Sequence, residues 1–157
     1  MFDLSGKSAL VTGASGGIGG AIARRLHQAG ANVGLSGTRA DALEALAAEL
    51  GERCAVLPCD LSDGEAVGAL IGQADEALGS VDIVITNPPF HQGHALDSAM
   101  TDRLLAAAAR VLQPGGTAYV VAQRHENLHT RMLQWFTDVE VVSKHPSHVV
   151  LQATTSA

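Results

Sequence analysis

One glycine-rich stretch, VTGASGGIGGAIA at residues 11–23, most restricts what this chain can fold into. It follows an apolar run and opens an amphipathic segment. Gly13, Gly17 and Gly19 have the spacing of a strand-to-helix turn that holds a pyrophosphate: the first permits the turn, the second admits the phosphates, and the third lets helix and strand approach closely. Free N–H groups at the helix start then face the phosphates. The stretch predicts an α/β nucleotide-binding fold, and the alternative is a glycine-rich turn without a ligand.

Apolar and amphipathic segments alternate along the rest of the chain. The expected strands are residues 8–13, 31–37, 53–62, 81–87, 117–123, 138–145 and 147–154, and the expected helices are residues 17–30, 39–51, 63–79, 95–116 and 126–136. Alternating elements of this length predict a parallel sheet with helices on both faces, which is a three-layer Rossmann-like α/β sandwich. The last two strands flank Pro146 and Ser147, so we expect them to form an antiparallel hairpin.

The end of the second expected strand bears on cofactor choice. A site selective for NAD needs an Asp or Glu here for the ribose hydroxyls. The chain has Gly37, Thr38 and Arg39 instead, so an acid is missing and a cation is present. This favours the 2′-phosphate of NADP. Arg39 could equally be a solvated charge at the start of a helix.

Asp60 follows the third expected strand, where its carboxylate could hold the amino group of an adenine. Its alternative role is to cap the helix that begins near Ser62. Ser62 or Asp63 could provide that cap instead.

With these motifs, residues 1–87 resemble the front half of the short-chain dehydrogenases/reductases, most closely the bacterial β-ketoacyl-acyl-carrier-protein reductases. The matching residues are TGASGGIG (12–19), GTR (37–39), CDLSD (59–63) and Asn87. The resemblance implies NADPH as cofactor, with Ser15 and Arg39 near the 2′-phosphate and Asp60 near the adenine. The cofactor-binding residues that it implies are Gly13, Ser15, Gly17, Ile18, Gly19, Thr38, Arg39, Asp60 and Asn87.

The catalytic residues of that family are missing. The family continues after Asn87 with Ala-Gly, then supplies a serine and a Tyr-x-x-x-Lys pair. Here Tyr119 is the one tyrosine and Gln123 stands where the lysine belongs, while the two lysines are Lys7 and Lys144. No tyrosine has the lysine that would lower its pKa for general acid catalysis. We therefore expect no catalytic residue and no reduction of a ketone.

The motif NPPF at residues 87–90 indicates a different chemistry. The side-chain carbonyl of Asn87 and the backbone carbonyl of Pro88 can accept hydrogens from an exocyclic amine. Pro89 stiffens the loop and Phe90 can stack on a base. The alternative is a proline-rich turn with a buried phenylalanine.

Residues 87–157 resemble the back half of class I methyltransferases, most closely the bacterial small-subunit ribosomal RNA guanine-N2 methyltransferases. NPPF, LQPGGTAYVVAQ (112–123) and the closing strand pair carry this resemblance. Such enzymes hold S-adenosylmethionine with their own glycine loop and an acid after the second strand, both replaced here. We therefore expect at most weak adenosyl binding through Asp60 and no methyl transfer, and Asn87, Pro88, Pro89 and Phe90 become a vestigial amine-positioning loop. A methyltransferase that acts on a nucleic-acid amine stays the alternative function, and an NADPH-dependent ketoacyl reductase is the third.

Both resemblances imply an open sheet that begins 3-2-1-4-5. We therefore interpret the chain as an artificial chimera joined at Asn87, with natural recombination as the less favoured origin. The expected order is 3-2-1-4-5-7-6 with strand 7 antiparallel. The expected single domain covers residues 1–157, of which residues 1–87 derive from a reductase and residues 88–157 from a methyltransferase. Reductases of this family form tetramers through elements that are absent here, so we expect a monomer.

Composition also changes at residue 87. Residues 1–87 hold five Lys/Arg and eleven Asp/Glu, whereas residues 88–157 hold five of each. Fourteen of the 17 glycines precede residue 88, and six of the seven histidines follow it. The net charge of −6 argues against tight nucleic-acid binding, because phosphate contacts need clustered Lys and Arg.

The remaining features suggest no further site. No apolar run reaches about 18 residues, so we expect a soluble, cytoplasmic protein without a membrane span. Cys54 and Cys59 lie five apart on one expected strand, so they face opposite sides and cannot form a disulfide. His125 and His129 lie four apart on an expected helix, but no acid or cysteine accompanies them on that face at the right distance, and we expect no metal site.

Overall fold

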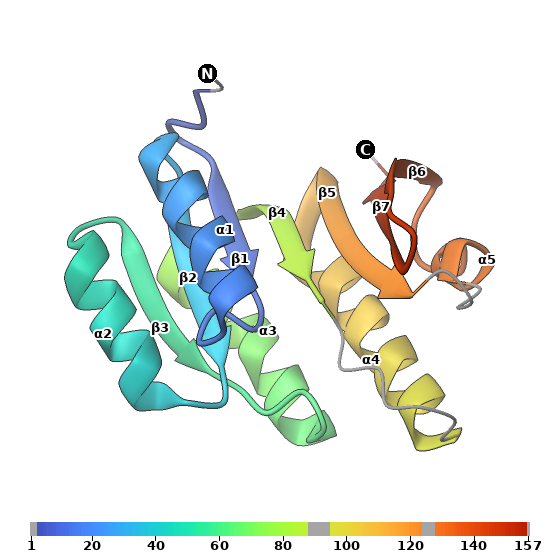
Figure 1. Cartoon of the computed structure of the whole chain (residues 1–157), viewed down its shortest axis with the longest axis horizontal. Coiled ribbons are helices and arrows are strands. Elements are labelled where there is room, and N and C mark those ends of the chain that lie inside the picture. Colours follow the sequence, from blue (N-terminus) through green and yellow to red (C-terminus); the bar gives the residue numbers. More distant parts are fainter. Residues whose placement is uncertain (1–2, 88–94, 124–127, 157) are drawn as a thin grey trace.

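In the computed structural model, seven strands form one continuous sheet in the order β3-β2-β1-β4-β5-β7-β6 (Figure 1). The structure describes residues 3–87, 95–123 and 128–156. The strands are β1 (Ser8–Val11), β2 (Asn32–Gly37), β3 (Cys54–Pro58), β4 (Val81–Thr86), β5 (Leu112–Gln123), β6 (Asp138–Lys144) and β7 (His148–Thr154). The helices are α1 (Gly17–Gln28), α2 (Ala40–Leu50), α3 (Gly64–Leu78), α4 (Ala95–Val111) and α5 (Leu128–Met132). β7 is antiparallel to both β5 and β6, and the other pairs are parallel, which confirms the expected fold and order.

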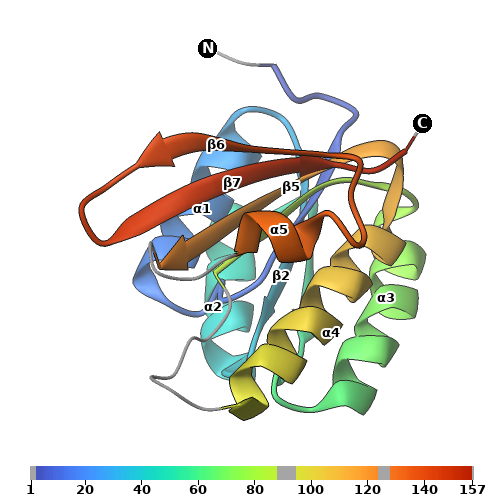
Figure 2. The same ribbon diagram turned by 90° about the vertical axis from the view of Figure 1, so that its right-hand side faces the viewer.

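Helices cover both faces of the sheet. α1 and α2 lie in front of the β1–β3 part in Figure 1, and α3 lies behind it. α3 and α4 lie side by side on this second face in Figure 2, with α5 also on that side. Apolar side chains at helical spacing explain the packing: Leu43 and Leu46 of α2 are buried on one face, and Val67 and Leu70 of α3 on the other.

The segments before and after residue 87 share one core. The larger apolar cluster combines Leu10 and Leu70 with Leu105 and Leu151 from the later segment. Asp82 adds a polar link, because its carboxylate accepts hydrogen bonds from the backbone N–H of Ser8 (2.9 Å) and from the side-chain amide of Gln113. The last part of the chain therefore completes the sheet begun by the first part.

The expected boundary between α4 and β5 was wrong. The sequence predicted a helix to residue 116, but α4 ends at Val111 and β5 starts at Leu112. Pro114 disfavours helical backbone at the residue before it. Leu112 instead pairs with Val81, and the register then shifts before Ile83 pairs with Thr117. Pairing with β4 thus extends the strand back through the turn.

Smaller differences occur elsewhere. The helix expected over residues 126–136 is α5, which has five described residues, and residues 124–127 lie outside the described part. Phe136 follows it and is buried in the core, while Trp135 packs partly against that core, as expected for packing residues. β1 ends at Val11, not at residue 13 as expected, because the chain turns at Thr12. β3 ends at Pro58, not at residue 62, because the chain turns beyond Pro58.

We predict that filling a small cavity at the contact between α3 and α4 stabilises the protein. An apolar cavity of about 20 Å³ is lined by Val84, by Val67 and Leu70 of α3, and by Leu104 and Ala108 of α4, among others. At about 24 cal/mol per Å³, Val84→Ile should raise the free energy of unfolding by about 0.5 kcal/mol in urea denaturation.

The matched control is Val81→Ile. Val81 is fully buried and does not line the cavity, so the added methyl overpacks the core and should cost about 1 kcal/mol. An equal loss of unfolding free energy in both variants would contradict the presence of this cavity.

Candidate functional site

A cleft of about 600 Å³ lies at the carboxyl ends of β1 to β4. In an open parallel sheet, ligands bind at the point where the strand order reverses, which here lies between β1 and β4. The lining residues are Thr12, Gly13, Ser15, Ser36, Gly37, Thr38, Cys59, Asp60, Leu61, Ser62, Asn87, Met100 and Arg103. Met100 and Arg103 come from α4, so both segments of the chain contribute to the cleft.

The glycine loop after β1 has the geometry of a phosphate cradle. Gly13 has φ +68°, which glycine adopts without strain. A Cβ on Gly19 would lie 2.1 Å from the carbonyl oxygen of Gly13, so only glycine allows this approach of helix and strand. Nothing lies within 4 Å of a Cβ placed on Gly17. Gly16 provides no side-chain cap for α1, and Ile18 is 69% exposed, so the helix start is open to a ligand.

The loop after β2 places a cation beside the glycine loop. Nη2 of the exposed Arg39 donates a hydrogen bond to the carbonyl oxygen of Ser15 at 3.2 Å. The Ser15 hydroxyl lies against Gly37, where a Cβ would come within 2.7 Å of its Oγ. Thr38 lines the cleft next to them. Ser15 and Thr38 thus line the same cleft and Arg39 is bonded to Ser15, while their role toward a 2′-phosphate stays a prediction.

Asp60 contributes a negative charge to the cleft. Hydrogen bonds from the hydroxyl and then the backbone N–H of Ser62 lower the pKa of its exposed carboxyl, so it is ionised at neutral pH. Asp63 caps α3 by accepting hydrogen bonds from the N–H groups of Glu65 (3.0 Å) and Ala66 (3.4 Å). Asp60 is therefore not needed as the helix cap.

Asn87 is exposed and lines the cleft at the end of β4. Beneath it, the buried hydroxyls of Thr12 and Thr86 form a 2.7 Å hydrogen bond that joins β1 to β4. Pro88, Pro89 and Phe90 lie outside the described residues. Their role in positioning an amine stays a prediction.

Three residues that line the cleft lie outside every motif that the sequence singled out: Ser36, Met100 and Arg103. Ser36 is a polar residue near the end of a buried strand, which is a pattern that could have pointed to it. Burial, followed by the charges of Asp60 and Asp63, raises the pKa of the Cys59 thiol, so the thiol is protonated at neutral pH. Met100 and Arg103 enter the site only because α4 packs beside α3.

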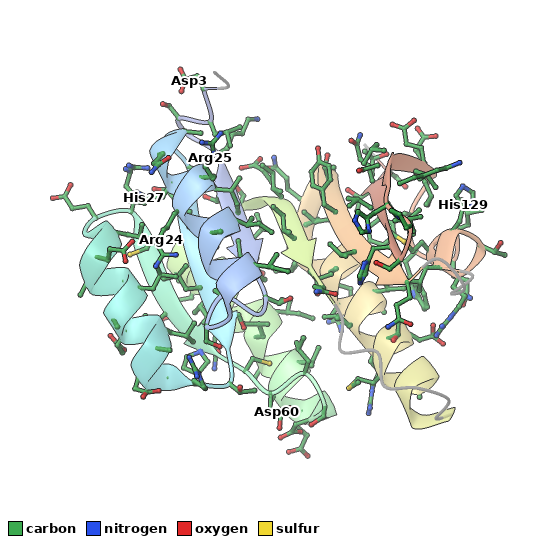
Figure 3. The ribbon with its side chains drawn as sticks, viewed as in Figure 1. Asp3, Arg24, Arg25, His27, Asp60 and His129 are labelled. Carbon is green, nitrogen blue, oxygen red and sulfur yellow. The ribbon has the colours of Figure 1, made fainter. Side chains whose placement is uncertain are left out.

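The other candidates lie apart from this cleft. Figure 3 shows His129 on α5, far across the molecule from Asp60. Within the described ranges, no three His, Cys, Asp or Glu side chains gather as metal ligands, and His125 lies outside those ranges. Cys54 and Cys59 are free thiols in the two apolar clusters on opposite faces of the sheet. None of the helices, as far as the structure describes them, has the length and apolar character of a membrane span.

The glycine loop and the cleft at the strand reversal define a Rossmann-like protein. The Methyltransferase small domain family matches residues 15–152, and the chain belongs to this family. It is also 35% identical over 113 residues to ribosomal RNA large subunit methyltransferase G of Ectopseudomonas mendocina (strain ymp). The aligned residues cover 72% of this chain and 28% of that protein. That name refers to the large ribosomal subunit, whereas the sequence alone suggested small-subunit enzymes.

The second similarity is to nodulation protein G and to a ketoacyl reductase of known structure. The chain is 58% identical over 87 residues to nodulation protein G of Rhizobium sp. (strain N33), covering 55% of this chain and 36% of that protein. It also superposes on the crystal structure of 3-ketoacyl-(acyl-carrier-protein) reductase from Brucella melitensis complexed with NADH. The TM-score is 0.55 and the identity 26%, over 70% of this chain and 48% of that one. The chain thus combines reductase-like and methyltransferase-like segments, and it spans about a third of the length of these curated relatives.

We predict opposite outcomes for two alanine substitutions in the glycine loop. Gly19→Ala places a Cβ against the Gly13 carbonyl and should lower the free energy of unfolding by about 3 kcal/mol. Gly17→Ala meets open space and should change it by less than about 0.5 kcal/mol. Urea denaturation of the two purified variants measures both, and equal stabilities would contradict the loop geometry.

A second pair of variants tests which aspartate in the loop before α3 caps the helix. Asp63→Ala should cost about 1 kcal/mol of stability, because two N–H groups at the helix start lose their acceptor. Asp60→Asn keeps a side-chain oxygen that can accept the hydrogen bonds from Ser62. It should therefore leave the stability nearly unchanged. A larger thermal destabilisation for Asp60→Asn than for Asp63→Ala would reassign the cap.

Proposed function

We propose that this chain is an engineered chimeric Rossmann scaffold, joined at Asn87, that binds an NADP(H)-type dinucleotide and catalyses neither parent reaction. The observation that carries the proposal is the pairing of the open glycine cradle with Arg39 beside Ser15. We further propose a monomeric, single-domain cytoplasmic protein whose partner is the nucleotide.

The residues present fit such a ligand. The diphosphate would lie at the start of α1, where Gly17 leaves space and the helix dipole favours an anion. The 2′-phosphate would lie at the guanidinium of Arg39 with the hydroxyls of Ser15 and Thr38. The carboxylate of Asp60 would accept a hydrogen bond from the amino group of the adenine. Asn87, at the end of β4, would border the nicotinamide end.

The residues beside the proposed cofactor site support the expected absence of reductase turnover. Tyr119 lies within β5, paired with Ile85 and Gln152, and is not among the described residues that line the cleft. Gln123 closes the same strand in place of a lysine. Among the described residues that line the cleft there is therefore no tyrosine–lysine pair to act as general acid toward a carbonyl substrate.

Family membership favours a second candidate, an S-adenosylmethionine-dependent methyltransferase that acts on an exocyclic amine of a nucleic acid. The family match over residues 15–152 and the antiparallel β7 support it. The loop after β2 argues against it, because Thr38 and Arg39 offer no carboxylate to the ribose hydroxyls.

Calorimetric titration with NADPH, NADH and S-adenosylmethionine tests the proposal. We expect NADPH to bind at least about tenfold more tightly than NADH, since a charge-assisted phosphate contact contributes about 1.4 kcal/mol or more. Arg39→Gln should remove this preference, whereas Arg25→Gln, an exposed arginine on α1 away from the cleft lining, should keep it. Binding of S-adenosylmethionine without binding of NADPH would favour the methyltransferase over the dinucleotide-binding scaffold.

Turnover assays complete the test. We expect neither NADPH oxidation with a β-ketoacyl thioester nor transfer of a labelled methyl group to guanine-containing RNA. Either activity would overturn the proposal that the chain catalyses neither parent reaction.

A further inference from the structure

The hydroxyl of Ser36 is a buried polar group without a partner. The side chain is 1% exposed, and its Oγ makes no hydrogen bond within the described structure. The neighbouring hydroxyls of Thr12 and Thr86 bond to each other, and the Ser36 carbonyl accepts from Ala14 N–H at 2.9 Å. The hydroxyl alone is left unsatisfied, at the floor of the cleft. Because such a group costs stability unless something pairs with it, its position points to a ligand atom.

Arg103 lies at the mouth of the same cleft. Its guanidinium packs against Gly64, the first residue of α3, where a Cβ would come within 2.9 Å of Nη1. Among the described residues, no hydrogen bond or ion pair holds this guanidinium. A cation at the start of a helix also gains nothing from the helix dipole. Its charge and its planar face are therefore available to a ligand.

The same cleft also has apolar lining residues. Leu61, Met100 and the protonated thiol of Cys59 form its walls. Asp60 stands at the rim with its negative charge. An inner hydroxyl, apolar walls and a cation at the mouth suit a flat heteroaromatic ring: the ring nitrogens pair with the hydroxyl, and the guanidinium covers the ring face. A bare phosphate suits this part poorly, because it meets apolar walls and a carboxylate.

We propose that Ser36 and Arg103 form a purine-base subsite, in which the Ser36 hydroxyl donates a hydrogen bond to a ring nitrogen and Arg103 stacks on the ring. The subsite deepens the proposed dinucleotide binding and rests on it for the position of the phosphates. Ser36 precedes Asn87 and Arg103 follows it, so the base is bound by both segments of the chain. The chimera thereby gains a contact that its reductase-like segment lacks when taken alone.

Three substitutions at Ser36 and Arg103 test the subsite with NADPH. Ser36→Ala should weaken binding about fivefold, the effect of one lost hydrogen bond, while the melting temperature of the unliganded protein stays equal or rises. Arg103→Gln and Arg103→Lys should each weaken binding several-fold, because both lose the planar face. Arg110→Gln, an exposed arginine further along α4, is the matched control and should bind as the unmodified protein does.

Adenosine, which carries the base without phosphates, separates this inference from the dinucleotide proposal. Its binding, measured by saturation-transfer NMR, should fall in Ser36→Ala and Arg103→Gln but not in Arg39→Gln. If NADPH fails to bind while adenosine shows this dependence, the subsite stands and the dinucleotide proposal fails. Unchanged NADPH affinity in Ser36→Ala and Arg103→Gln would overturn the subsite alone. Full affinity in Arg103→Lys would assign Arg103 to a phosphate and also overturn it, as would a lower melting temperature for Ser36→Ala.

Discussion

The hydrogen-bond ladders on the two sides of β4 are the constraint on which the rest of the structure depends. Ile83, Val84 and Ile85 pair in parallel with β1 on one side and with β5 on the other. β4 is therefore the central strand that connects the reductase-like part of the sheet to the methyltransferase-like part. Parallel strands bury both faces, so one misplaced register here would move apolar side chains out of the core on either side.

This central position explains how segments of different resemblance can share one core. α3 precedes residue 87 and α4 follows it, and the two pack together on the same face of the sheet. The contact buries both apolar faces but leaves a small apolar cavity between them. Small misfits of this kind are tolerated when the apolar pattern and total volume are kept, because the hydrophobic effect is not directional. The polar links at Asp82 and between Thr12 and Thr86 add directional contacts on either side of β4.

The same arrangement determines the chemistry that the cleft offers. Its phosphate cradle depends on local geometry, namely the close approach of Gly19 to Gly13. Its floor and mouth depend on packing between distant segments, which brings Ser36 and Arg103 into one cavity. The site thus consists of a locally encoded part and a part that forms only when the sheet closes.

Much of the fold and half of the site could be read from the sequence. Hydrophobic periodicity and glycine spacing predicted every strand and the glycine loop, because these patterns depend on residues close together in the chain, whereas the strand order was implied by the two family resemblances. The start of β5 was misjudged, since the backbone of Leu112 is drawn into the sheet by pairing with Val81, 31 positions away. Whether Asp60 or Asp63 caps α3 was also open, because both have a suitable side chain and only the folded turn decides between them.

The sequence by itself determined that this protein is a Rossmann-like sandwich with a glycine cradle and no reductase catalytic pair. Those properties follow from residue types at short fixed spacings, which act through backbone conformation and side-chain chemistry. Only the tertiary structure decided that the Ser36 hydroxyl is buried with no partner among the described residues and that Met100 and Arg103 of α4 line the cleft. Burial and long-range contact are properties of the packed sheet and helices, and no local pattern in the chain encodes them.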